Sequence, residues 1–487
     1  MVGSARASQK VPEAGGERSF SELSVILRNY YQSPSVRQRM LEFLGGSDVS
    51  NVSAAFIAGN DGSRSLGAVM PVDRLAECWD HGLEIERSLW DRRSLIVHLD
   101  LEFHSFDHPE AAWMEPERAF QIQESTLAAT RKVLAPFGID PLICVSGRGY
   151  HLAWSVENTC RVFRRLANIG RIPPSLESRY IQPCSPEGAC VGLEQGRAFS
   201  GLGMLLEFVW HRALRERNRE TRIPLQPTAI EVGPGAHGRE IISLDLSEYG
   251  DPMDSRQIRI PFSAYLKPLQ FEWLLGAEGA RRLLPIFEIP LGGMKIQEAI
   301  AAARDADAVV ALARECPVPI PDASEPMEHL LDEYEHSELR EFHNRFNASL
   351  GDWAGWETPF SSLRLPETPR CMRWILDHPN DMLLRPAALQ HVVRVLMACN
   401  WSPARIAQAI YASYRQDCNW GEIWNRLDPS HRAIFYTRLF AGMVATGSDP
   451  LIDFNCVSHQ EKGLCSSPEC QTNLIAFRNN LLNRSTV

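Results

Sequence analysis

Residues 95–103 read Leu95-Ile-Val-His-Leu-Asp-Leu-Glu-Phe103, in which every second residue from Leu95 to Phe103 is apolar and the positions between them carry Ile96, His98, Asp100 and Glu102. A period of two is typical of a β-strand with one buried face. The opposite face carries Asp100 and Glu102, and it is expected to be open to solvent. Two carboxylates on one strand face repel each other, and a divalent cation between them relieves that repulsion. The pattern therefore favours a Mg²⁺ or Mn²⁺ site at Asp100 and Glu102.

A second stretch, Val145-Ser-Gly-Arg-Gly-Tyr-His-Leu152, has the composition of a tight turn, because glycine and serine dominate turns. Backbone N–H groups in such a turn bind anions, and the planar guanidinium of Arg148 fits two phosphate oxygens at once. The segment is expected to cradle a polyphosphate. A plain hairpin turn is the alternative interpretation.

A third stretch, Ile241-Ile-Ser-Leu-Asp-Leu246, alternates in the same way and carries Asp245. Its nearby acidic competitors are Glu240, Glu248 and Asp251. The alternation of the apolar residues around Asp245 favours this residue as the third carboxylate. A basic segment, Arg259-Ile-Pro-Phe-Ser-Ala-Tyr-Leu-Lys267, comes soon after.

In order and spacing, these segments resemble the catalytic domain of the archaeo-eukaryotic primases, the primase-polymerase superfamily, over roughly residues 20–290. The resemblance implies an α+β fold with an RRM-like mixed sheet and flanking helices. It also implies that Asp100, Glu102 and Asp245 are catalytic and hold two divalent ions. The nucleotide-binding residues that it implies are Ser146, Gly147, Arg148, His151, Arg259 and Lys267. Tyr265 stands where many members of the family have a histidine.

Three cysteines lie close together near the C-terminus, in a polar segment with glycine and proline: Cys456, Cys465 and Cys470. Such thiols are soft ligands for zinc or for an iron–sulfur cluster. A fourth ligand would come from Cys371, His459 or Cys418, and His459 would complete a local Cys₃His zinc site. A reduced surface loop is the alternative.

Apolar residues at a period of 3.6 predict helices between Cys371 and Cys456, and one of them begins with Ser402 as N-cap and Pro403 behind it. This helical region resembles the C-terminal domain of the primase large subunit over roughly residues 361–480. The resemblance implies a [4Fe–4S] cluster on Cys371, Cys456, Cys465 and Cys470, with Zn²⁺ as the alternative.

The chain of 487 residues is expected to hold about two or three domains. We assign residues 1–18 to a disordered tail, 19–295 to the catalytic domain, 296–360 to a helical and acidic linker region, and 361–487 to the helical cysteine-ligated domain. The formal net charge is -10, so binding of nucleic acid requires a local basic groove. Cys184 and Cys190 suggest a zinc knuckle, but only two cysteines lie close together there, and a loop with incidental cysteines is the favoured interpretation.

The expected activity is that of a DNA primase-polymerase, a nucleotidyltransferase that makes or extends primers on single-stranded DNA from NTPs or dNTPs. A replicative helicase is a candidate partner. The sequence has no apolar run of membrane-spanning length and no signal peptide, so we expect a cytoplasmic protein, associated with the nucleoid in a prokaryote. A metal-dependent nuclease and a non-catalytic nucleic-acid-binding protein with structural zinc are the alternatives.

Overall fold

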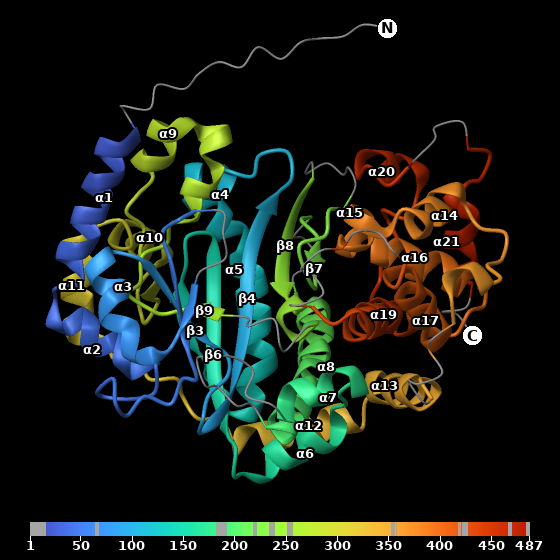
Figure 1. Ribbon diagram of the computed structural model, residues 1–487, viewed down its shortest axis with the longest axis horizontal. Helices are drawn as coiled ribbons and strands as arrows, with labels where there is room; N and C mark the ends of the chain where they lie inside the picture. The colour runs from blue at the N-terminus through green and yellow to red at the C-terminus, as the bar shows by residue number, and fades with distance from the viewer. Residues whose placement is uncertain are drawn as a thin grey trace, which may run out of the picture.

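The computed structural model describes residues 16–63, 68–181, 192–217, 222–232, 239–250, 257–351, 356, 358–416, 420, 427–465 and 470–483. Within these ranges the molecule is a mixed α+β structure, with a sheet region on one side and a helical region on the other (Figure 1). The expected tail falls outside the described residues, apart from residues 16–18, which begin the first helix. Cys184 and Cys190 also lie outside them.

The described strands form two sheets. The central sheet has the order β10-β5-β6-β4-β8-β7, and the smaller sheet has the order β2-β1-β3-β9. The strands of the central sheet are β4 (Ser94–Ser105), β5 (Leu142–Val145), β6 (Gly149–Glu157), β7 (Leu225–Gln226), β8 (Glu240–Asp245) and β10 (Ile289–Pro290). Those of the smaller sheet are β1 (Ile57–Asn60), β2 (Ala68–Met70), β3 (Glu84–Ser88) and β9 (Gln257–Arg259).

Helices of the sheet region precede and follow these strands along the chain. They are α1 (Gly16–Tyr30), α2 (Pro34–Phe43), η1 (Val72–Arg74), α3 (Leu75–His81), α4 (Ala111–Met114), α5 (Pro116–Leu134), η2 (Ala135–Phe137), α6 (Arg161–Ile169), α7 (Pro174–Ile181), α8 (Leu193–Glu216), η3 (Ser247–Gly250), η4 (Lys267–Phe271) and α9 (Glu272–Arg282). The next four are α10 (Ile296–Ala302), α11 (Ala306–Glu315), α12 (Pro326–Glu335) and α13 (Glu338–Ser349).

The apolar face of β4 packs against helices, as its alternation predicts. The five residues of this face are all buried: Leu95, Val97, Leu99, Leu101 and Phe103. Helix α5 covers the neighbouring part of β6, where Phe120 meets Tyr150 edge-on at 5.1 Å between ring centroids. Each such buried apolar side chain contributes about 2 kcal/mol relative to exposure. This burial fixes which face of β4 points into the core, so the carboxylates must point the other way.

The acidic run at residues 322–341 forms α12 and the start of α13. Its carboxylates pair with arginines of earlier helices, because Arg165 of α6 contacts both Asp332 and Glu335, and Arg212 of α8 contacts Glu333. Part of the negative charge of the chain is therefore neutralised on the surface of the sheet region.

The C-terminal region is helical. Its described helices are η6 (Phe360–Ser362), α14 (Arg370–Asp377), α15 (Pro379–Leu383), α16 (Pro386–Ala398), α17 (Pro403–Tyr414), α19 (Pro429–Ala445), α20 (Cys456–Glu461) and α21 (Leu474–Leu482). Ser402 caps α17 by accepting a hydrogen bond from the N–H of Arg405, as predicted.

Helix α19 packs against η3, the turn that follows β8, and the fit is close: a Cβ atom on Gly250 would overlap the ring of Phe435. A single apolar core runs through both regions. Among the described helices, none is both long and apolar enough to span a bilayer.

Candidate active site and cysteine cavity

The three predicted carboxylates lie on neighbouring strands of the central sheet. In the antiparallel pairing of β4 with β8, Asp100 stands directly opposite Asp245. In the pairing of β4 with β6, Asp100 stands opposite His151. Glu102 follows two positions along β4, and therefore on the same face. The strand register thus brings together Asp100, Glu102 and Asp245, which are widely separated in the sequence.

The Asp100 carboxylate is poorly compensated. Its Oδ1 atom is buried without a hydrogen-bond partner among the described residues, and the Nε2 atom of His151 lies 3.6 Å away. Burial, reinforced by the charge of Glu102, raises the pKa of Asp100 to about 7. Divalent cations favour the ionised form of clustered carboxylates. The donor set of Asp100, Glu102 and Asp245 therefore fits Mg²⁺ or Mn²⁺.

Glu102 is surrounded by cationic side chains. Arg148 donates to both carboxylate oxygens, from Nη2 to Oε2 and from Nε to Oε1 at 3.2 Å. Lys267 Nζ lies 4.0 Å from Oε1. Although burial opposes ionisation, Arg148 and Lys267 hold the pKa of Glu102 well below its usual range. The expectation of a solvent-facing carboxylate is wrong for Glu102, which is only 13% exposed, because these cations pack over it.

The turn at residues 146–149 closes the hairpin of β5 and β6. The Oγ atom of Ser146 accepts hydrogen bonds from the N–H groups of Arg148 and Gly149, at 3.4 and 3.2 Å. These two N–H groups are therefore already engaged within the turn. Both glycines are required by packing, because a Cβ atom on Gly147 would overlap the Tyr265 ring and one on Gly149 would overlap the carbonyl of Leu101.

Arg259 approaches the same site from the smaller sheet. It contacts Glu84 from Nε at 2.9 Å and Glu86 from Nη2 at 3.3 Å, and its guanidinium lies 4.5 Å from the ring centroid of Tyr265. The ring of Tyr265 thus lies between Arg259 and the turn at Gly147. Tyr265, which stands where many primase-polymerases have a histidine, therefore has a packing role here. Of the predicted nucleotide-binding residues, Arg148, His151 and Lys267 lie within 4.0 Å of Asp100 or Glu102. Ser146 and Gly147 belong to the turn that carries Arg148, and Arg259 reaches Glu288, the partner of His151.

Sequence reasoning missed three acidic residues at this site: Glu84, Glu86 and Glu288. The first two repeat the Asp-x-Glu pattern as Glu-x-Glu on strand β3, and this repetition was a usable signal. Glu288 stands alone in an apolar segment, where local sequence gives no indication of its partner. As the side chains stand, no group of three or more His, Cys, Asp or Glu residues within the described ranges is arranged to hold a metal ion.

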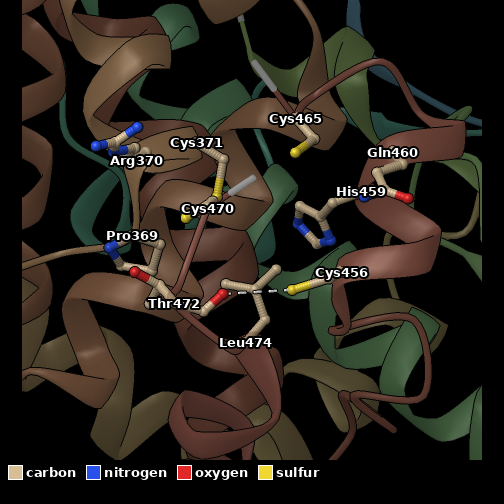
Figure 2. Close-up of a pocket in the computed structure, with 10 residues that line it drawn as sticks. All are labelled: Pro369, Arg370, Cys371, Cys456, His459, Gln460, Cys465, Cys470, Thr472 and Leu474. Carbon is tan, nitrogen blue, oxygen red and sulfur yellow. Dashed lines mark hydrogen bonds between the residues drawn. The ribbon is translucent and has the colours of Figure 1, made fainter. Parts of the chain in front are cut away.

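Figure 2 shows a cavity in the helical region that is lined by the four predicted cysteine ligands. Cys371 comes from α14 and Cys456 from α20, and Cys465 and Cys470 lie in the segments after α20. Four thiols from separate segments at one cavity are a donor set that fits an iron–sulfur cluster or zinc. Burial, followed by the proximity of the other three cysteines, raises the pKa of Cys371 to about 12. Cys418, the third candidate for fourth ligand, lies outside the described residues.

His459 also lines the cavity, but both of its ring nitrogens have partners. Nδ1 lies 2.9 Å from the carbonyl oxygen of Asn455, which can only accept, so this nitrogen carries the proton. Nε2 lies 2.7 Å from Nδ1 of His391, and Nε2 of His391 lies 3.2 Å from the sulfur of Cys371. His459 would have to leave this chain of hydrogen bonds before it could bind a metal ion.

The sequence matches no family model, no curated protein and no solved structure.

Proposed function

We propose that this chain is a primase-polymerase that transfers nucleotides onto a template-directed strand. The observation that carries the proposal is the strand register, which aligns Asp100 with Asp245 and places Glu102 beside them. In this reading the three carboxylates hold two divalent ions. When bound, the ions activate the attacking hydroxyl and stabilise the triphosphate and its leaving group.

The cationic side chains around the carboxylates support a triphosphate as the substrate. Arg148, His151, Arg259 and Lys267 approach from three segments of the chain, and Lys267 is 33% exposed. Such a group of fixed positive charges neutralises phosphate oxygens without reorganising during transfer. A nuclease would need fewer cationic side chains, because the phosphodiester that it cleaves carries one negative charge and a triphosphate carries several.

Arg148 has two alternative partners in this proposal. In the structure it is bound to Glu102, which is also a proposed metal ligand. With a metal–triphosphate complex bound, Glu102 would be a metal ligand, and the Arg148 guanidinium would be free to pair with phosphate oxygens instead of this carboxylate. Arginine suits such an exchange, because its planar fork fits carboxylate and phosphate alike.

We propose that the helical region carries a [4Fe–4S] cluster on Cys371, Cys456, Cys465 and Cys470. The occupied nitrogens of His459 support four thiolates over a Cys₃His zinc site. This region would hold the template and the initiating nucleotide, and its contact with η3 joins it to the strand that bears Asp245.

The deciding experiment incubates the full chain with single-stranded DNA, Mg²⁺ or Mn²⁺, and labelled NTPs or dNTPs, without a primer. Template-dependent products that disappear in Asp100→Asn are the expected result. Degradation of the template without synthesis would instead identify a nuclease. Template binding without either reaction, under both metal ions and both nucleotide types, would favour a non-catalytic binding protein.

A further inference from the structure

Glu288 is a buried carboxylate with a fixed backbone. It directly precedes β10, and its side chain is 1% exposed. Its N–H donates to the carbonyl of Ser263 at 3.0 Å, and its own carbonyl accepts from the N–H of Phe262 at 2.6 Å. A carboxylate at such a position is costly unless it has polar partners. The contacts of its side chain therefore indicate why an acidic residue occupies the site.

The carboxylate of Glu288 contacts two of the proposed nucleotide-binding residues. His151 Nδ1 lies 3.1 Å from Oε1 and 3.0 Å from Oε2. Arg259 Nη1 lies 3.8 Å from Oε2, at the longer limit of an ion pair. The hydrogen bond to His151 is thus the closer of the two contacts.

The direction of this hydrogen bond follows from elementary chemistry. A carboxylate accepts, so Nδ1 of His151 must carry a proton. The ring is then held with Nε2 on its other side, 3.6 Å from Oδ1 of Asp100. In many enzymes a buried carboxylate orients a histidine and stabilises its imidazolium form, in which both ring nitrogens donate.

We propose that Glu288 is a positioning residue that holds His151 as an imidazolium, with Nδ1–H donating to Glu288 and Nε2–H directed toward the bound triphosphate. The inference rests on the proposed function, in which His151 binds the nucleotide. It extends that function to a residue that belongs to none of the sequence motifs. Glu288 itself touches neither the carboxylate cluster nor the substrate in this proposal, so it acts only through His151.

The test measures the affinity for a fluorescent ATP analogue, in Ca²⁺ so that no transfer occurs, together with single-stranded DNA binding and thermal unfolding. Glu288→Gln is nearly isosteric but replaces one acceptor oxygen with a donor. It should weaken nucleotide binding about tenfold, as expected for loss of one charge-assisted hydrogen bond. DNA affinity should not change. In a His151→Ala background, Glu288→Gln should cause no further loss.

A matched control is Glu231→Gln, because Glu231 is also a buried carboxylate but bonds Arg239, which is not part of the site. It should leave nucleotide affinity unchanged. As a readout independent of ligand, ¹⁵N-histidine spectra should show a protonated Nδ1 at His151 in the wild type and a changed signal in Glu288→Gln.

Three results would overturn the role of Glu288. One is unchanged nucleotide affinity in Glu288→Gln, and another is an unprotonated Nδ1 at His151 in the wild type. The third is an equal loss of affinity with and without the His151 side chain, which would mean that Glu288 acts through Arg259 or through the fold. If the wild type binds no triphosphate at all, the proposed function fails as well.

Discussion

Glu207 of α8 and Arg438 of α19 form a buried ion pair between the sheet region and the helical region. Arg438 donates to Oε1 of Glu207 from Nε at 2.9 Å and from Nη2 at 2.7 Å. The other oxygen, Oε2, lies 2.9 Å from Nε2 of His343 in α13. The carboxylate of Glu207 therefore joins three helices, which come from the three segments assigned from the sequence: residues 19–295, 296–360 and 361–487.

This pair predicts a specific dependence of stability on pH. Burial alone would raise the pKa of Glu207, but Arg438 and His343 outweigh it and lower that pKa to about 2 from a usual value of 4.5. Because the folded-state pKa is depressed, the stabilisation is complete above about pH 4.5 and is lost as the pH falls toward 2. Glu207→Gln should reduce the free energy of unfolding by about 3 kcal/mol at neutral pH.

Urea unfolding of wild type and Glu207→Gln at several pH values checks this prediction. The difference between the two proteins should narrow as the pH falls below about 4.5. A difference that stays constant down to pH 3 would show that the charge of Glu207 is not its source. Glu177→Gln is a suitable control, because Glu177 is exposed and its carboxylate lies 3.7 Å from Arg197.

Asp100 and Glu102 should respond differently to neutral substitution. Asp100→Asn should lower the rate of primer synthesis by about a hundredfold or more, because phosphoryl transfer tolerates a misplaced metal ion poorly. Its thermal stability should hold or rise, since burial raises the pKa of this carboxyl. Glu102→Gln should lose both activity and stability, because Arg148 and Lys267 would lose their shared partner. Equal stability of the two variants would contradict the charge distribution described above.

Arg148→Lys should weaken triphosphate binding by about tenfold without unfolding the protein. Lysine keeps the charge but lacks the second donor of the fork, and one charge-assisted hydrogen bond corresponds to about 1.5 kcal/mol. Titration of a labelled nucleotide is the measurement. Arg118→Lys is the control, because Arg118 also pairs with a glutamate of the central sheet, Glu240, but is 45% exposed. Equal effects of the two substitutions would place the phosphate site elsewhere.

The cysteine cavity should hold iron through four thiolates. Protein purified without oxygen should be brown and contain about four irons per chain. Cys371→Ser should lose the colour and loosen the helical region, because ligation energy contributes to folding. His459→Ala should keep the iron.

Cys399→Ser controls for loss of a thiol, since Cys399 does not line the cavity. Colourless protein with one tightly bound zinc, retained in Cys371→Ser and lost in His459→Ala, would establish the Cys₃His alternative.

The sequence by itself determined the local structure around both sites. Apolar residues at every second position of residues 95–103 indicated a strand and its buried face, because side-chain direction in a strand has a period of two. The composition of Ser146–Gly149 indicated a tight turn. Ser402 and Pro403 marked the start of a helix, since capping satisfies N–H groups within the same few residues. Each of these signals depends on neighbours along the chain.

Only the tertiary structure decided which distant residues became partners. Glu288 reaches His151 because β10 pairs with β5 beside β6, and His391 reaches both Cys371 and His459 because α16 packs between their segments. The expected open face at Glu102 is covered because Arg148 folds back over it. Each of these charged and polar groups needs a partner because it is buried. The arrangement of strands and helices determines which residue becomes that partner, and no local sequence pattern encodes it.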